Sequence, residues 1–162
     1  MSNEGYHPAK LFTVEEANGA LPLVRAITAD LARLSREVIE RRQRLSHLLD
    51  GRDLEEGDPY DEELVHIEQE LEKDTAQLQE YVEELRKLGV EPKNGPEGLV
   101  DFPSMVDGRV VYLCWKLDEP ELLYWHELEA GFAGRQSLTA ASVAGDPLHE
   151  EEPLDSPNSQ DD

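Results

Sequence analysis

Residues 98–136 read GLVDFPSMVDGRVVYLCWKLDEPELLYWHELEAGFAGRQ, and their β-branched and aromatic residues indicate β-strands. The pair Asp107-Gly108 is typical of a two-residue β-hairpin turn, because both central positions of such a turn need a positive φ. We therefore expect one strand over residues 99–105 and a second over residues 110–117, joined by this turn.

A two-residue turn also sets how these strands pair. It places Asp101 opposite Cys114, Phe102 opposite Leu113 and Val100 opposite Trp115. Side chains alternate between the two faces of a sheet, so one face is expected to be apolar and to pack on the rest of the protein. That face holds Val100, Phe102, Val111, Leu113 and Trp115, and the other face holds Asp101, Tyr112 and Cys114.

Residues 122–126, LLYWH, predict a third strand, because they follow the turn signal DEPE at residues 118–121. The result is a three-stranded antiparallel meander. The register of the third strand is open by one residue, and such a slip moves every side chain to the opposite face. The sequence therefore leaves open whether His126 shares the face of Asp101 and Cys114.

The chain before this region is expected to be helical. Thr13 followed by Glu16 is typical of a capping box, in which the two side chains satisfy free amides at a helix start. Pro22 has no amide hydrogen and follows Asn18-Gly19. We therefore expect a short helix over residues 13–20 and a long one from residue 22.

Seven-residue apolar repeats predict that two long helices pair as an antiparallel hairpin. Folding the chain about residue 56 brings the polar members of the repeats, Arg41 and Asp74, into adjacent layers, where we expect them to pair and to specify the register. Gly89 is expected to end the hairpin, and residues 90–98 to be a connector because of their prolines and glycines. The repeats are Val24, Leu31, Val38 and Leu45 with Ile27, Leu34, Arg41 and Leu48, then Leu64, Leu71, Leu78 and Leu85 with Ile67, Asp74, Tyr81 and Leu88.

Together these patterns predict an α+β fold. A long antiparallel coiled-coil-like helical hairpin, residues 13–89, packs with a small three-stranded antiparallel β-meander and a glycine-rich loop, residues 98–138, in a single domain over residues 12–138. Residues 1–11 are expected to form a flexible arm. Residues 139–162 are expected to be a disordered acidic tail, because they contain no Lys or Arg and almost nothing to bury.

The composition restricts the class of partner and compartment. Charged residues make up 32% of the chain and the formal net charge is −22, which opposes nonspecific binding to nucleic acid or to an anionic membrane and favours cations. One cysteine excludes an intrachain disulfide framework. With no apolar segment of secretory or membrane-spanning type, we expect a cytoplasmic protein.

Three segments, FTVEEANGALPLV, GLVDFPSMVDGRVVYLCWK and EPELLYWHELEAGFAGRQ, resemble the bacterial family catalogued as domain of unknown function 2203. The resemblance covers about residues 12–138, and its most specific parts are GLVDFP, YLCW and WHELEAGFAGRQ. The family's description as metal-binding-related implies a metal site and implies no particular reaction.

His126 is the best candidate for a metal ligand in the residues themselves. A neutral imidazole binds transition metals, and Glu127 and Glu129 supply oxygen donors nearby. In a strand these glutamates face away from His126, and only a helical turn would bring Glu129 to the same side. In either case Asp101, Cys114 or carboxylates of the helical hairpin would have to complete the ligand set. The alternative is an ordinary strand-end histidine bonded to a backbone carbonyl, beside solvated glutamates and a packed, inert Cys114. Both interpretations stay open here.

Two further groups have weaker signals. Glu63 and His66 have the spacing of a helical metal-ligand pair, but there is one copy only, which favours a solvated helix face. The loop containing Gly131, Gly134 and Arg135 either binds an anion through its backbone amides or has a structural role, with Arg135 neutralising a buried carboxylate such as Asp101.

Two functional hypotheses follow. The first is a small metal-binding protein that holds a divalent transition metal near the third strand and the GFAGRQ loop, with catalytic residues, if any, unknown. The second is a non-enzymatic interaction or adaptor module that binds a protein partner through the helical hairpin or the acidic tail, without metal. Because two helices leave apolar surface uncovered, we also expect a homodimer.

Overall fold

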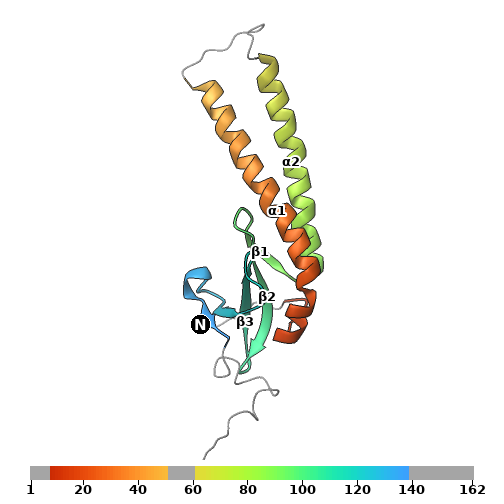
Figure 1. Ribbon diagram of the computed structural model, residues 1–162, viewed down its shortest axis with the longest axis vertical. Coiled ribbons are helices and arrows are strands. Elements are labelled where there is room, and N and C mark those ends of the chain that lie inside the picture. Colours follow the sequence, from red (N-terminus) through yellow and green to blue (C-terminus); the bar gives the residue numbers. More distant parts are fainter. Residues whose placement is uncertain (1–7, 51–60, 139–162) are drawn as a thin grey trace, which may run out of the picture.

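The computed structural model describes residues 8–50 and 61–138, which form two helices and a five-stranded sheet. The long elements are α1 (Val14–Leu49), α2 (Asp61–Lys87), β2 (Leu99–Val106) and β3 (Arg109–Lys116). The short ones are β1 (Glu91–Asn94), β4 (Tyr124–Glu127), the 3₁₀ turn η1 (Phe132–Gly134) and β5 (Gln136–Ser137). Figure 1 shows the helices as a long hairpin and the sheet beside the end where α1 begins and α2 finishes. The predicted α+β class is confirmed.

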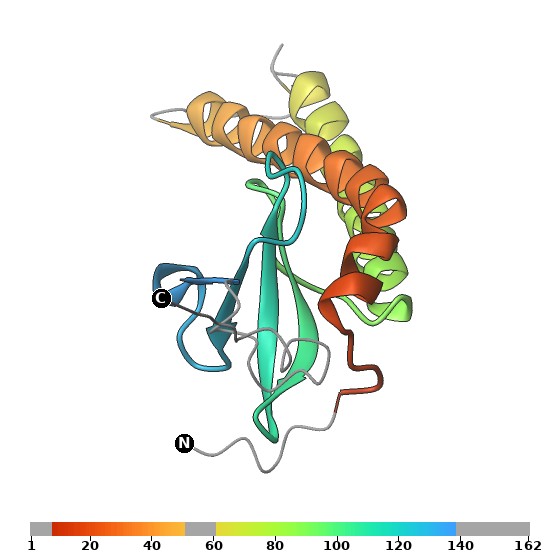
Figure 2. The ribbon, with the colours of Figure 1, turned by 60° about the horizontal axis from the view of Figure 1, so that its bottom comes forward.

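Helix α1 begins with the predicted capping box. The Glu16 amide donates to Thr13 Oγ1 and the Thr13 amide donates to Glu16 Oε1, each over 3.0 Å. The prediction of two helices around Pro22 is wrong, because α1 runs unbroken through this proline. A proline removes one backbone hydrogen bond and bends a helix without ending it when neighbouring residues are held by the core. Ala17, Leu21 and Val24 are buried there, and α1 changes direction near its start in Figure 2.

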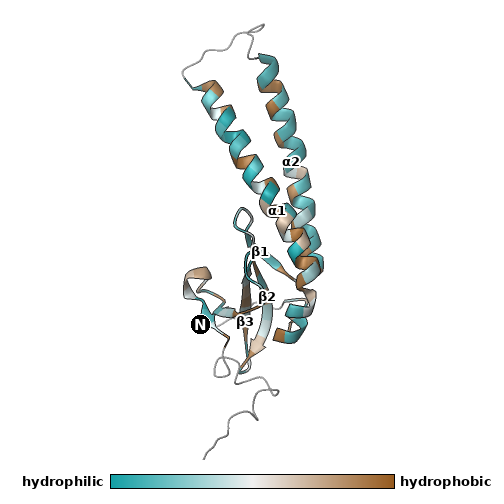
Figure 3. Ribbon diagram, viewed as in Figure 1, coloured by the Kyte–Doolittle hydropathy of each residue, from teal (hydrophilic) through white to brown (hydrophobic). Residues whose placement is uncertain are grey.

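The two helices are antiparallel, as the seven-residue repeats predict. Arg41 forms an ion pair with Asp74 between the helices, which confirms the expected pairing of these two residues. Helix α2 ends at Lys87, and Gly89 just after it has a φ of 91°, which allows the Val90 amide to donate to Leu85 O over 3.0 Å. The distal half of the hairpin is largely hydrophilic in Figure 3. The expected fold of the chain about residue 56 lies outside the described residues, as do residues 1–7 and the tail 139–162.

The sheet is antiparallel with strand order β1-β2-β3-β4-β5. The predicted register of β2 with β3 is confirmed. Asp101 pairs with Cys114, Phe102 with Leu113 and Val100 with Trp115. Asp107 and Gly108 both have positive φ, of 53° and 77°, as the tight turn requires. The prediction of three strands is wrong, because β1 and β5 add one strand at each edge.

The residues predicted to be a connector contain strand β1. Pro92 pairs with Val100 of β2, and the register shifts between Pro92 and Asn94. A proline is compatible with an edge strand, where its missing N–H breaks no ladder, and a bulge accommodates the irregular residue. Prolines and glycines therefore limit β1 to four residues without preventing it.

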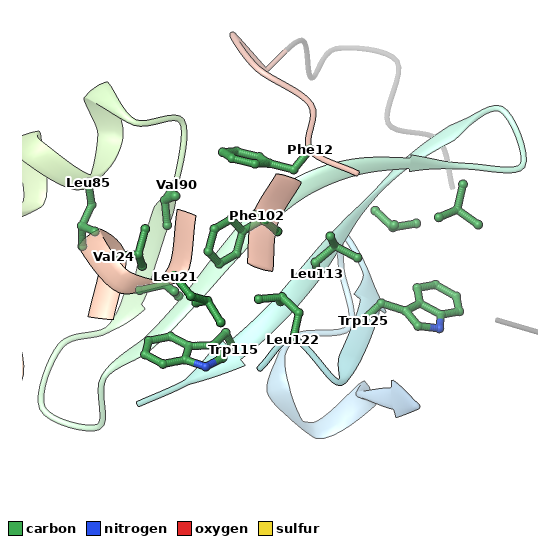
Figure 4. Packing of buried hydrophobic residues seen from close by; sticks show 14 of the residues in the cluster. Phe12, Leu21, Val24, Leu85, Val90, Phe102, Leu113, Trp115, Leu122 and Trp125 are labelled. Carbon is green, nitrogen blue, oxygen red and sulfur yellow. The ribbon is translucent and has the colours of Figure 1, made fainter. Parts of the chain in front are cut away.

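The core lies between the helices and one face of the sheet. Figure 4 shows Leu21 and Val24 of α1 with Phe102, Leu113 and Trp115 of the sheet. Phe12 is buried against Phe102 in an edge-to-face contact with ring centroids 5.1 Å apart. The predicted apolar face is buried: Val100, Phe102, Val111, Leu113 and Trp115 are each 0% exposed. The face that carries Asp101 and Cys114 therefore points away from the helices.

Neither helix in the described residues is both long enough and apolar enough to cross a bilayer. The expected domain limits, the homodimer and the protein partner stay predictions.

Candidate metal centre

The pairing of β4 decides where His126 lies. Tyr112 pairs with His126 and Leu113 with Trp125, so His126 shares a face with Tyr112, Asp101 and Cys114. Trp125 takes the core face instead and is 6% exposed. The face that the sequence left open for His126 is therefore the one that carries the carboxylate and the thiol.

Three polar side chains from three adjacent strands converge on this face. Asp101 of β2, Cys114 of β3 and His126 of β4 are 1%, 0% and 2% exposed. One ligand atom from each lies within 4.8 Å of the other two. His126 Nε2 is 3.1 Å from Asp101 Oδ2 and 3.2 Å from Oδ1. Buried polar groups need hydrogen-bond partners, and the His126 imidazole and the Asp101 carboxylate are partners of each other.

A backbone contact fixes the orientation of the imidazole. His126 Nδ1 lies 2.7 Å from the carbonyl oxygen of Glu127, and a carbonyl only accepts hydrogen bonds, so Nδ1 carries a proton and donates it. This leaves Nε2 pointing at the Asp101 carboxylate. A histidine that binds a metal usually donates its other ring N–H to a carbonyl or a carboxylate in this way.

The environment moves the pKa of both His126 and Cys114. Burial alone lowers the pKa of His126, but the Asp101 carboxylate and the Glu127 carbonyl favour the charged ring, and the net pKa is raised. Burial, and next the Asp101 charge, raise the pKa of the Cys114 thiol to about 12. Without a metal, the trio therefore holds a thiol at neutral pH, and His126 keeps its second proton to a higher pH than a free imidazole does, because its pKa is raised.

The two glutamates predicted as ligands lie elsewhere. Glu127 faces away from the trio and pairs with Arg109, whose Nε donates to Glu127 Oε1 over 3.1 Å. Hydrogen bonding to Arg109 lowers the pKa of the Glu127 carboxyl. Glu129 is exposed in the turn after β4. Side chains alternate along β4, so the Glu127 side chain points away from that of His126. Only the backbone carbonyl of Glu127 reaches the site.

The glycine-rich loop lies beside the same trio. Gly131 has a φ of 68° and precedes η1, and Gly134 is so close to Ala130 that a Cβ there would lie 2.5 Å from the Ala130 Cβ. Arg135 pairs with Glu119, not with the Asp101 suggested by the sequence, over 2.7 Å. Its guanidinium also stacks on Tyr124, 4.0 Å from the ring centroid.

The helical pair Glu63 and His66 is not part of this cluster. Glu63 accepts from Arg44 Nη2 over 3.1 Å, and His66 is exposed. Within residues 8–50 and 61–138, Asp101, Cys114 and His126 form the one group of three with metal-ligand geometry.

Sequence patterns missed two residues near the site. Lys93 places its Nζ 4.6 Å from the Tyr112 ring, and Tyr112 in turn lies beside the His126 ring, with centroids 5.5 Å apart. Lys93 belongs to β1, a strand that the sequence did not predict because prolines and glycines surround it. Glu119 precedes Pro120 in the expected turn, and a turn signal does not reveal that its carboxylate would hold Arg135.

Comparisons with known proteins give one result. No curated protein and no solved structure has a significant match to the chain. A family model described as "Uncharacterized conserved protein (DUF2203)" matches residues 10–138, which include both helices, the whole sheet and the Asp101, Cys114 and His126 trio. The chain therefore belongs to the DUF2203 family.

Proposed function

We propose that the protein binds a divalent transition metal ion through Asp101, Cys114 and His126. The observation that carries this proposal is the convergence of a carboxylate, a thiol and a correctly oriented imidazole at a fully buried point. Nε2, the ring nitrogen not held by the Glu127 carbonyl, is the one that faces the Asp101 carboxylate.

Charge balance supports the same proposal. A carboxylate, a thiolate and a neutral imidazole carry two negative charges in total, which a divalent ion neutralises. Burial of an uncompensated charge is costly, whereas a neutral metal complex is compatible with a buried site. A bound ion would take the place of a proton on His126 Nε2, and it would displace the proton of Cys114, because thiols bound to such metals are deprotonated.

The donor set indicates the class of metal. Thiolate and imidazole ligands favour zinc and neighbouring transition metals, whereas magnesium and calcium require oxygen ligands. Zinc is usually four-coordinate, so the trio leaves one position for a further ligand. We propose a zinc-type centre.

Elemental analysis of the purified full chain tests this proposal. We expect about one equivalent of transition metal in the wild type, and loss of that metal in His126→Ala, Cys114→Ser and Asp101→Asn. His66→Ala is the matched control, since His66 is exposed on α2, and it should keep the metal.

Two results would contradict the metal proposal. One is a wild type that binds no transition metal after reconstitution with zinc or cobalt. The other is metal that persists in all three ligand variants. The first result would favour the adaptor hypothesis, which needs no metal. The second result would mean that other residues hold the metal.

A further inference from the structure

Arg135 is the charged residue of the glycine-rich loop, and the metal proposal does not use it. Its side chain is 12% exposed and the side chain of its partner Glu119 is 15% exposed, so this ion pair is largely removed from solvent. Arg135 Nη2 donates to Glu119 Oε1 over 2.7 Å and to the backbone oxygen of Cys114 over 3.2 Å. The pair is therefore attached directly to the strand that carries Cys114.

Several contacts hold the guanidinium in one place. It lies over the rings of Tyr124 and Phe132, at 4.0 and 4.6 Å from their centroids. Glu119 is itself fixed, because its Oε1 accepts from the Lys116 amide over 3.0 Å and its carbonyl accepts from Trp115 Nε1 over 3.0 Å. A planar guanidinium that is stacked and paired in this way is preorganised and loses little entropy on binding a further acceptor.

The guanidinium has hydrogen-bonding capacity left beside Cys114. Its Nη2 is within hydrogen-bond distance of the Cys114 backbone oxygen. In addition, Arg135 Nε is buried and has no hydrogen-bond partner among the described residues. A buried donor without a partner is unusual, and it gives the guanidinium spare capacity for hydrogen bonding.

We infer that Arg135 is a positioning residue of the metal centre, which donates a hydrogen bond to the metal-bound sulfur of Cys114 while Glu119 holds it in place. This inference rests on the proposed metal site. Donors to a ligand sulfur tune the metal–thiolate bond, and such outer partners often change metal affinity by about 10–100-fold.

The charges are consistent with this role. The divalent ion is neutralised by Asp101 and Cys114, and Arg135 is neutralised by Glu119, so the buried assembly has no net charge. Removal of the guanidinium alone would leave Glu119 as an unpaired carboxylate of low exposure, at a cost in stability. For this reason the test uses Arg135→Lys and the double variant Arg135→Gln/Glu119→Gln, which leave no buried charge unpaired.

The test is a titration of the metal-free full chain with cobalt(II), followed through the thiolate-to-cobalt absorption. We expect Arg135→Gln/Glu119→Gln to weaken cobalt binding by about 10–100-fold and to shift this absorption band. Arg135→Lys keeps the charge without the planar fork, and it should recover part of the affinity.

Arg109→Gln is the matched control, because Arg109 pairs with Glu127 on the face away from the trio and should leave both readouts unchanged. Unchanged affinity and an unchanged band in the double variant would overturn the role of Arg135, while loss of the band in Cys114→Ser would leave the metal site standing. A wild type without cobalt binding would overturn the metal site itself, and the role of Arg135 with it.

Discussion

His126 lies 3.1 Å from Asp101 although the two residues are 25 positions apart and belong to strands separated by β3. Their side chains meet across β3, and Cys114 of that strand completes the trio. In the metal-free protein this contact is a buried hydrogen bond, which becomes an ion pair when the imidazole is protonated. The effect of pH on this contact and its replacement by a metal can both be measured.

The stability of the metal-free protein should fall as the pH rises from about 6.5 through the folded-state pKa of His126. The pKa of His126 is raised in the folded state, so the folded protein holds this proton more tightly than the unfolded chain, in which the pKa is about 6.5. The ion pair therefore contributes fully below pH of about 6.5, and the contribution is lost as the pH rises through the folded-state pKa. Urea unfolding in the presence of a chelator measures this dependence.

The control for the pH dependence is His126→Asn, which cannot titrate. The difference in unfolding free energy between the wild type and this variant should be largest at acidic pH and shrink as the pH rises. A difference that is constant or that grows with pH contradicts the ion pair. At low pH we expect Asp101→Asn to destabilise by about 3–5 kcal/mol, because the charged imidazole is left buried without a partner.

Cys114 should be inert to thiol reagents in the folded, metal-free protein. Its thiol is 0% exposed and has a pKa of about 12, so thiolate is scarce at pH of about 8. We expect labelling by a disulfide reagent to proceed only through unfolding, and the same reagent to react at once in denaturant. Fast labelling of the folded chain would show that the trio is open to solvent.

The ion pair between Arg41 and Asp74 should matter more for register than for stability. Arg41→Leu alone is expected to cost about 1–3 kcal/mol, since it leaves the largely buried Asp74 without its partner. The double variant Arg41→Leu/Asp74→Leu should be close to wild type or more stable, because the desolvation cost of both charges disappears. Urea unfolding measures both free energies. A double variant that is less stable than Arg41→Leu alone would contradict this expectation.

Gly98 should tolerate alanine worst among three glycines that differ in their surroundings. Its φ is 69° and an added Cβ would lie 2.7 Å from the Leu117 Cβ, so Gly98→Ala combines strain with a clash and should cost more than about 2 kcal/mol. Gly108→Ala meets no atom within 4 Å and should cost about 1–2 kcal/mol from its positive φ alone. Gly19→Ala, in α1 with open space, should stabilise by about 0.5–1 kcal/mol. Thermal unfolding ranks the three.

The sequence predicted the structure best where a short motif is compatible with one local conformation. Thr13 and Glu16 form the expected cap, and Asp107-Gly108 sets the pairing of β2 with β3, which places Asp101 opposite Cys114. These outcomes depend on residues close in the chain. The contact between Arg41 and Asp74 was also predictable, because two seven-residue repeats constrain each other over a long distance.

The rest depended on tertiary context. Strand β1 has no alternating pattern of apolar and polar residues, and it contains Pro92. Its pairing therefore depends on the edge that β2 offers after β2 and β3 have paired. The register of β4 follows from packing of Trp125 in the core, which decides that His126 joins the trio and that Glu127 does not. Nearness to His126 in sequence favoured Glu127 and Glu129 as ligands, whereas neighbouring strands supply Asp101 and Cys114.

The most direct test of the metal centre is a cobalt(II) titration of the metal-free wild type beside Cys114→Ser. The structure predicts a thiolate-to-cobalt absorption band that saturates at about one equivalent in the wild type and is absent from Cys114→Ser. A wild type that takes up no cobalt, or a cobalt complex without the thiolate band, would contradict a metal ion held by Asp101, Cys114 and His126.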